Sequence, residues 1–135
     1  MGAHHRPRWG LTRINPAAVR LGALADLAIL SALIAVFVIA RWVGAAGFGT
    51  VVIVLASLLP PVAGGFVAGR HQRSAPLTNG AAAAAAAMVA YVVFRVLDAA
   101  VRGTTLHPAS VVIFAMLTVT LGLLGGFAGF RTTAP

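Results

Sequence analysis

Residues 17–42 read AAVRLGALADLAILSALIAVFVIARW, and this long apolar run decides the fold class of the chain. Its core, from Leu27 to Ala40, contains no charged residue. A helix needs about 20 predominantly apolar residues to cross the hydrocarbon core of a bilayer. The core is followed by Arg41 and Trp42 and not by the small residues of a signal-peptide cleavage site. We therefore expect a first transmembrane helix at 17–42.

Three further apolar runs follow, at about 50–69, 79–101 and 108–130. The run at 79–101 contains seven consecutive alanines, which favour a helix but are only weakly apolar. This span therefore depends most on its neighbours for insertion. The sequence thus predicts an all-α polytopic membrane protein with four transmembrane helices.

The polar segments between these runs are short. We expect a basic cytoplasmic arm at 1–16, a four-helix transmembrane domain at 17–131 and a cytoplasmic tail at 132–135. The loops, at about 44–49, 70–78 and 102–107, are too short to hold an extramembrane domain. Whatever the protein does, it therefore does within the bilayer or at its faces.

Composition supports the same class. The chain has 135 residues, 60% hydrophobic and 9% charged, with a mean hydropathy of +0.97, which lies far outside the range of soluble domains. Cysteine is absent from the sequence, which excludes disulfides and thiolate metal sites. The net charge of +8 comes from arginines at the ends of apolar runs, which favours anionic lipid headgroups at the cytoplasmic face over nucleic acid as the partner.

The arginines also predict an orientation. The two that would lie outside are Arg41 and Arg102, and the larger set on the opposite side is Arg6, Arg8, Arg13, Arg20, Arg70, Arg73 and Arg131. Because positive charge accumulates on the cytoplasmic side, both termini are expected in the cytoplasm of a bacterial inner membrane. All ten basic residues are Arg and Ala and Gly are abundant, which is typical of a GC-rich genome such as that of an actinobacterium.

The second and fourth spans share a pattern. VVI occurs at the start of both, and Gly-Gly-Phe followed by Arg occurs at the end of both, which indicates two helical hairpins in parallel repeat. Small residues spaced four apart let helix backbones approach closely. They predict either packing within the bundle or an interface with a partner, and they are Gly65, Gly69, Gly122, Gly125, Gly126 and Gly129.

Pro60 and Pro61 lie near the middle of the second span. Their rings remove the two backbone donors that would pair with the carbonyls of Ala56 and Ser57, so a kink is expected. Such a break lines a cavity in some transporters, and it also occurs in passive membrane helices.

Asp26 and Asp98 are the two acids of the sequence, and both lie in apolar runs. Asp26, one or two turns from the cytoplasmic end of its helix, is a candidate proton or cation ligand because an intramembrane carboxylate is costly. A structural ion pair with Arg20, Arg70, Arg73 or Arg131 is the alternative. Asp98 shares a helix face with Arg95 and Arg102, which favours a self-neutralising charge cluster over a ligand site.

Catalytic and metal-binding patterns are missing from the sequence. His4, His5, His71 and His107 are scattered along the chain with no second ligand at metal-binding spacing. The serines lack both a nucleophile-elbow context and matching His and Asp residues at the same depth. We therefore expect no enzymatic activity, no cofactor and no metal.

The stretch GGFVAGRHQRSAPLTNGAAAA, at residues 64–84, and the preceding INPAAVRLGALAD, at 14–26, resemble small uncharacterised four-span membrane proteins of prokaryotes. In that family a glycine-rich span ends in an Ala-Gly-Arg or Ala-Gly-Tyr turn before an Asn-Gly or His-Gly pair opens the next span. The resemblance covers about half of the chain and implies the topology, with no activity to carry over.

Two functions fit these observations. The leading hypothesis is a non-catalytic accessory or stabilising subunit of a larger inner-membrane complex, such as a transporter of lipids or envelope components. It is motivated by the weakly inserting alanine-rich span and the several small-residue faces. The alternative is a small proton-coupled transporter or channel that uses Asp26, because a four-span chain of this length with one acid in the first helix resembles the small multidrug transporters.

Overall fold

The computed structural model describes residues 14–103, 105 and 107–132, with the side chains of 46, 48–50, 53, 54, 94, 98 and 102 excepted. The part of the chain that is described folds into helices without a strand. The helices are α1 (Pro16–Trp42), α2 (Ala46–His71), α3 (Pro76–Arg102) and α4 (Pro108–Arg131).

Local sequence explains where the helices begin. Helices α1, α3 and α4 each start at a proline, whose fixed φ suits the first turn and whose missing N–H is not needed there. Asn15 caps α1, because its side chain accepts hydrogen bonds from the backbone N–H groups of Ala17 and Ala18 at 3.0 and 3.4 Å. Gly103 ends α3 with a φ of 66°, in the left-handed region that favours glycine.

The second and third helices begin earlier than hydropathy predicts. Helix α2 starts at Ala46 and α3 at Pro76, ahead of the expected 50–69 and 79–101. In α3 the polar first turn is accommodated by Asn79, which is fully buried. Asn79 Nδ2 donates to the carbonyl of Ala75 at 2.8 Å, and Asn79 Oδ1 accepts from the backbone N–H of Asn15 at 2.8 Å. Asn79 therefore belongs to the helix and joins the starts of α1 and α3.

Three helices are suited to a membrane by length and composition. Among the described residues these are α1, the stretch Pro76–Val101 of α3, and α4; α2 does not belong to the set. An all-helical protein with helices long and apolar enough to cross a membrane is therefore confirmed for the described residues, and the fourth span stays a prediction.

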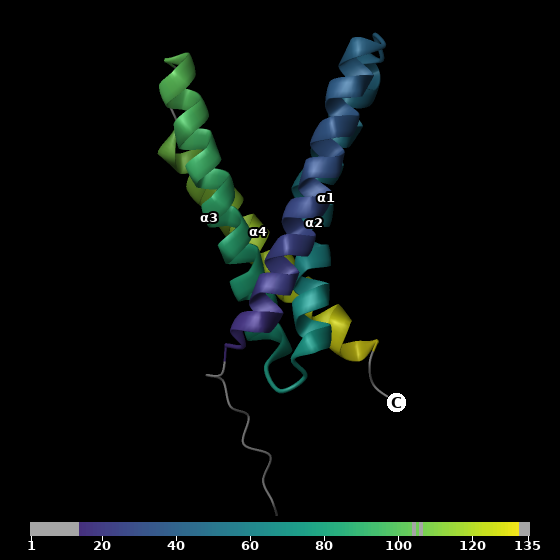
Figure 1. Ribbon diagram of the computed structural model, residues 1–135, viewed down its shortest axis with the longest axis vertical. Coiled ribbons are helices and arrows are strands. Elements are labelled where there is room, and N and C mark those ends of the chain that lie inside the picture. Colours follow the sequence, from purple (N-terminus) through teal and green to yellow (C-terminus); the bar gives the residue numbers. More distant parts are fainter. Residues whose placement is uncertain (1–13, 104, 106, 133–135) are drawn as a thin grey trace, which may run out of the picture.

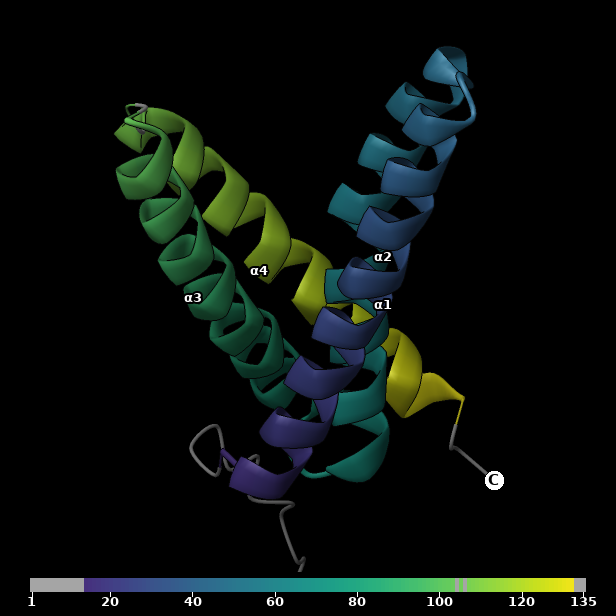
Figure 2. The same ribbon diagram turned by 45° about the horizontal axis from the view of Figure 1, so that its top comes forward.

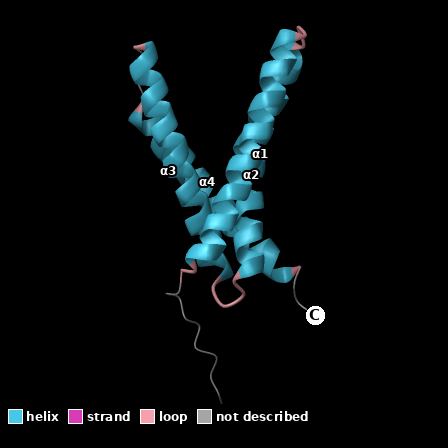
Figure 3. Ribbon diagram, viewed as in Figure 1, coloured by secondary structure: helices cyan, strands magenta, loops and turns pink. Residues whose placement is uncertain are grey.

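The helices form two hairpins, α1 with α2 and α3 with α4, joined by short loops (Figure 3). The hairpins meet at the end where α1 begins and α4 finishes, and they diverge towards the opposite end, so the molecule has the outline of a V (Figure 1). Seen from the turned view, α4 crosses behind the α1/α2 hairpin (Figure 2). The point of the V therefore holds the tertiary contacts between the hairpins.

Helices α2 and α4 cross at glycines. A Cβ atom added at Gly65 would meet the carbonyl of Gly122, and one added at Gly69 would meet the carbonyl of Gly126. From the opposite helix, a Cβ at Gly125 would meet the carbonyl of Val62. The helix backbones therefore touch with no side chain between them, which is the packing that small residues permit in lipid. All six glycines singled out by the sequence are buried here, so their faces are used within the molecule.

The arrangement of the hairpins is only approximately repeated. Gly22 of α1 packs against the Gly64 carbonyl of α2, as Gly80 of α3 packs against the Gly122 carbonyl of α4. Helix α2 also packs on α3, and no equivalent contact joins α1 to α4 in the described chain. Residues of α1, α2, α3 and α4 meet around Asp26.

Candidate functional site

Asp26 is buried at the junction of the two hairpins. It is 3% exposed, and its Oδ2 atom has no hydrogen-bond partner among the described residues. Helix α1 starts at Pro16, so Asp26 lies about 15 Å along the helix axis, almost three turns in. Asp26 is therefore deeper than the one or two turns expected from the sequence. Counted from residue 17, where the helix was expected to start, it already lies nine residues, or about two and a half turns, along the helix.

The alternative expectation, an ion pair between Asp26 and an arginine of the same face, is wrong for the described residues. The four candidate partners are exposed at or beyond the ends of the helices: Arg20, Arg70, Arg73 and Arg131. The guanidinium of Arg131 instead lies over the ring of Phe127, 4.6 Å from its centroid. Asp26 therefore has no compensating positive charge within the described chain.

A cavity of about 40 Å³ adjoins Asp26. Thr118 of α4 lines the same cavity, is 6% exposed, and its Oγ1 atom is likewise buried without a hydrogen-bond partner among the described residues. The cavity is completed by residues of the other helices: Leu30, Ala56, Ser57, Pro60, Pro61, Ala87, Met88, Tyr91 and Phe114. Two buried polar groups from different helices thus face one small space.

Pro60 and Pro61 belong to this cavity. Helix α2 continues through both prolines, and both are buried. Pro60 has no N–H to donate to the carbonyl of Ala56, a residue that also lines the cavity. The sequence predicted a kink at the prolines; what the structure adds is their place beside Asp26, at the one level where α2 lacks two backbone donors.

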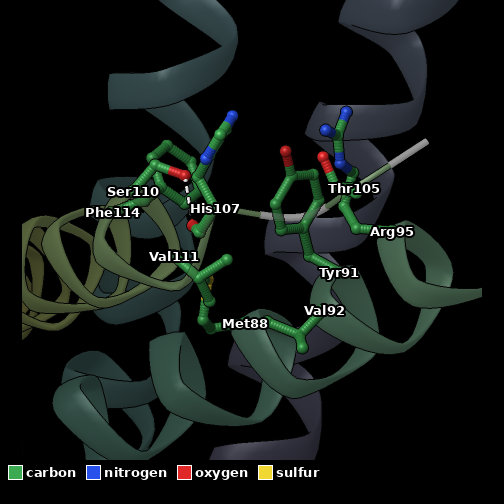
Figure 4. Close-up of a pocket in the computed structure, with 9 residues that line it drawn as sticks. All are labelled: Met88, Tyr91, Val92, Arg95, Thr105, His107, Ser110, Val111 and Phe114. Atoms are coloured by element: carbon green, nitrogen blue, oxygen red, sulfur yellow. Dashed lines mark hydrogen bonds between the residues drawn. The ribbon is translucent and has the colours of Figure 1, made fainter. Parts of the chain in front are cut away.

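A second, larger pocket of about 260 Å³ lies between α3 and α4, next to the loop that joins them (Figure 4). We call it the outer pocket. It shares Met88, Tyr91 and Phe114 with the cavity at Asp26. The rings of Tyr91 and Phe114 are in contact, with centroids 5.4 Å apart. The aromatic pair therefore lines both the outer pocket and the Asp26 cavity.

Arg95 of α3 lines the outer pocket together with His107, Thr105 and Ser110. The sequence placed Arg95 in a charge cluster with Asp98 and Arg102, but the side chains of those two residues lie outside the described part of the structure. The self-neutralising cluster accordingly stays a prediction.

Sequence reasoning missed Thr118, Tyr91 and His107 as site residues. Nothing in the sequence around Thr118 distinguishes it from other membrane threonines. Tyr91 carried one signal, because it is too deep in its span for the interfacial aromatic belt. His107 had none, since its partners come from α3 and the preceding loop.

The described residues contain no group of three His, Cys, Asp or Glu side chains that could hold a metal ion. Comparison with known protein families, curated proteins and solved structures finds no match. The geometry around Asp26 and the outer pocket is therefore the basis for a functional proposal.

Proposed function

We propose that this protein is a small membrane transporter in which Asp26 binds a proton or a small cation. The observation that supports it is the buried Asp26 carboxyl group, which has no arginine partner and shares a cavity with the unpartnered hydroxyl of Thr118. An unpaired carboxylate inside a membrane is costly, and such residues mark ion and proton pathways. A proton or a small cation removes that cost.

The chemistry of the cavity fits this ligand class. A carboxylate and a hydroxyl are oxygen donors, which hard cations prefer. The cavity volume of about 40 Å³ admits a water molecule or a bare ion and is too small for an organic substrate. Asp26 would thus be the coupling residue, and any larger cargo would bind elsewhere.

The proposal includes a topology of four spans with both termini in the cytoplasm of a bacterial inner membrane. Helix α2 is 26 residues long, close to its neighbours, and it packs on each of the other helices. The start of α1, the loop between α2 and α3 and the end of α4 lie at one end of the molecule (Figure 1). That end carries Arg70, Arg73 and Arg131, which makes it the cytoplasmic one.

A carbodiimide labelling experiment tests the ligand. Hydrophobic carbodiimides modify protonated carboxyl groups in apolar surroundings, and Asp26 is the remaining acidic side chain once Asp98 is replaced. We expect Asp26 in the Asp98→Asn protein to be modified, as measured by mass spectrometry, and to be protected either by raised pH alone or by sodium or lithium ions. Protection by pH alone identifies a proton site, and protection by the metal ions at constant pH identifies a cation site.

Flux in proteoliposomes then tests the transport function. We expect an imposed pH or sodium gradient to dissipate through the wild-type protein and through Thr120→Val, and not through Asp26→Asn. Thr120 is a suitable control because its exposed hydroxyl bonds to the carbonyl of Met116 in its own helix, at 2.8 Å. Unchanged flux in Asp26→Asn would refute the proposal.

A second candidate is the accessory subunit of a larger inner-membrane complex, without catalytic activity. The glycine faces that motivated the accessory-subunit hypothesis pack within the molecule. A different feature, the exposed half of α1, favours this hypothesis. Between Asp26 and Ala40, no residue of α1 is buried in the chain. This half of the helix, in the diverging arm of the V, offers an apolar surface to lipid or to another membrane protein.

Isolation in mild detergent separates the two candidates. A chromosomally tagged copy that brings down a large membrane protein in near-stoichiometric amount supports the accessory role. Recovery of the tagged chain alone, together with flux that depends on Asp26, supports the transporter. A stable protein that is free of partners at native expression and inactive in flux would contradict both.

A further inference from the structure

The outer pocket between α3 and α4 gathers polar groups that have no part in the proposed binding of a proton or cation by Asp26. Figure 4 shows the guanidinium of Arg95, the hydroxyls of Tyr91 and Thr105 and the ring of His107 directed to the same side of the pocket. Within the described chain, none of these groups has a hydrogen bond or ion pair. Ser110 differs, since its hydroxyl donates to the carbonyl of His107 at 2.7 Å.

The opposite side of the pocket is apolar. Met88, Val92 and Val111 form its floor, and the ring of Phe114 adds a wall (Figure 4). The pocket therefore has a polar side beside the loop between α3 and α4 and an apolar side opposite it. Such a division matches an amphiphile better than a fully polar solute.

The position of Arg95 points to a ligand. It lies about 10 Å along the axis from the end of α3 at Arg102, inside the apolar run and not at its edge. An arginine at this depth is costly and is found facing a partner or a water-filled cavity. Here Arg95 lines the pocket, so its positive charge can interact with an anionic ligand bound there.

We propose that the outer pocket binds the phosphate group of an amphiphile. Arg95 supplies a planar set of donors that suits phosphate, and Tyr91, Thr105 and His107 can donate from other directions. A carboxylate has two oxygens to accept these bonds, whereas a terminal phosphate has three. The volume of about 260 Å³ accommodates a headgroup, with the tails left in the bilayer.

This inference goes beyond the proton or cation site and does not depend on it. Asp26 and Thr118 line only the smaller cavity, whereas Arg95, Thr105 and His107 line only the larger pocket, so Asp26 is not among the groups proposed to hold the phosphate. Phosphate binding is therefore expected to survive the replacement of Asp26. If the protein is a transporter, the phosphate-bearing molecule bound here is its cargo or its regulator.

Binding to the full-length protein in an uncharged detergent tests the inference. The probes are dihexanoyl phosphatidic acid, dihexanoylglycerol, which lacks the phosphate, and inorganic phosphate, each measured by isothermal titration calorimetry. We expect the phosphatidic acid to bind and dihexanoylglycerol not to bind. Weaker binding of inorganic phosphate identifies a lipid headgroup as the source, and equal binding identifies a free phosphate.

Matched variants make the test specific. Arg95→Gln should weaken binding of the phosphatidic acid at least tenfold, and His107→Ala, at an exposed position before α4, should weaken it severalfold. Arg41→Gln removes the same charge from an exposed site at the same end of the molecule and should leave the affinity unchanged. Asp26→Asn should also bind normally.

Three results would overturn the inference. Equal loss of affinity in Arg95→Gln and Arg41→Gln would show general charge attraction, and equal binding of dihexanoylglycerol would show apolar adsorption. Failure of the wild-type protein to bind any phosphate probe, while Asp26 is still protected from carbodiimide, would refute this pocket and leave the Asp26 site intact.

Discussion

The carboxyl of Asp26 and the hydroxyl of Thr118 face the same cavity from α1 and α4, and both are buried. A buried polar group without a partner costs about 1–3 kcal/mol. Other buried polar side chains can avoid this cost, as Asn79 does by bonding to Asn15 and Ala75. The exception at Asp26 and Thr118 is therefore a feature that function explains better than stability does.

Replacing Thr118 by valine tests this cost. Thr118→Val keeps the shape and removes the unpartnered hydroxyl, so we expect the free energy of unfolding in detergent to rise by about 1 kcal/mol. Thr120→Val is the control, expected to lie within about 0.5 kcal/mol of the wild type because its exposed hydroxyl bonds within α4. Thermal unfolding in a buffer without sodium or lithium measures both. A loss of stability in Thr118→Val would show that the hydroxyl already has a partner.

Between elements, the decisive contact is the crossing of α2 and α4. Four glycines at this crossing lie against backbone of the other helix, which cannot move aside as a flexible side chain can. They are Gly65, Gly69, Gly125 and Gly129. The contact brings Thr118 on α4 towards the α1/α2 hairpin. The cavity at Asp26 therefore depends on the glycines even though none of them lines it.

Replacing Gly69 by alanine tests the crossing. The new Cβ would overlap the carbonyl of Gly126, so we expect a loss of about 2 kcal/mol or more in the free energy of unfolding. Gly47→Ala is the matched control in the same helix, because no atom lies within 4 Å of its added Cβ. Thermal unfolding of the two variants in detergent gives the comparison. Equal stability would mean that α2 and α4 do not touch as described.

The whole molecule combines a tight end with an open end. The glycine crossing and the bonds around Asn79 hold the hairpins together at the end where α1 begins, and both arms diverge from there (Figure 1). Lipid or a protein partner must cover the apolar faces of the arms. The two candidate functions differ at this scale. A transporter needs a path for its ligand that is shielded from lipid, and an accessory subunit needs a partner protein on the apolar face of an arm.

Topology is the prediction that belongs to this scale. The natural sequence has no cysteine, so single cysteines at Ala45 and Ser74, both exposed in loops, report separately on the two ends. In intact cells, we expect an impermeant maleimide to label Ala45→Cys and to leave Ser74→Cys unlabelled until the membrane is broken. Labelling of both from outside, or of neither, would contradict four spans with cytoplasmic termini.

The helical membrane fold could be predicted from the sequence alone, because apolar runs of membrane length can satisfy their backbone groups in lipid only as helices or closed barrels. It also marked Asp26, Arg95 and the glycines, since charges and small residues stand out against such runs. Hydropathy did not give the true starts of α2 and α3, because their first turns contain small or polar residues that are helical without being strongly apolar.

The neighbours of these residues could be identified only in the folded molecule. In the folded chain the glycines pack against neighbouring helices. Asp26 has no arginine partner among the described residues, and it shares a cavity with Thr118 and Pro60 of other helices. Which helix faces meet depends on close backbone contacts between residues far apart in the chain. Spacing along one helix shows which residues share a face, but it does not show which face of another helix will pack there. The cavity at Asp26 results from that packing.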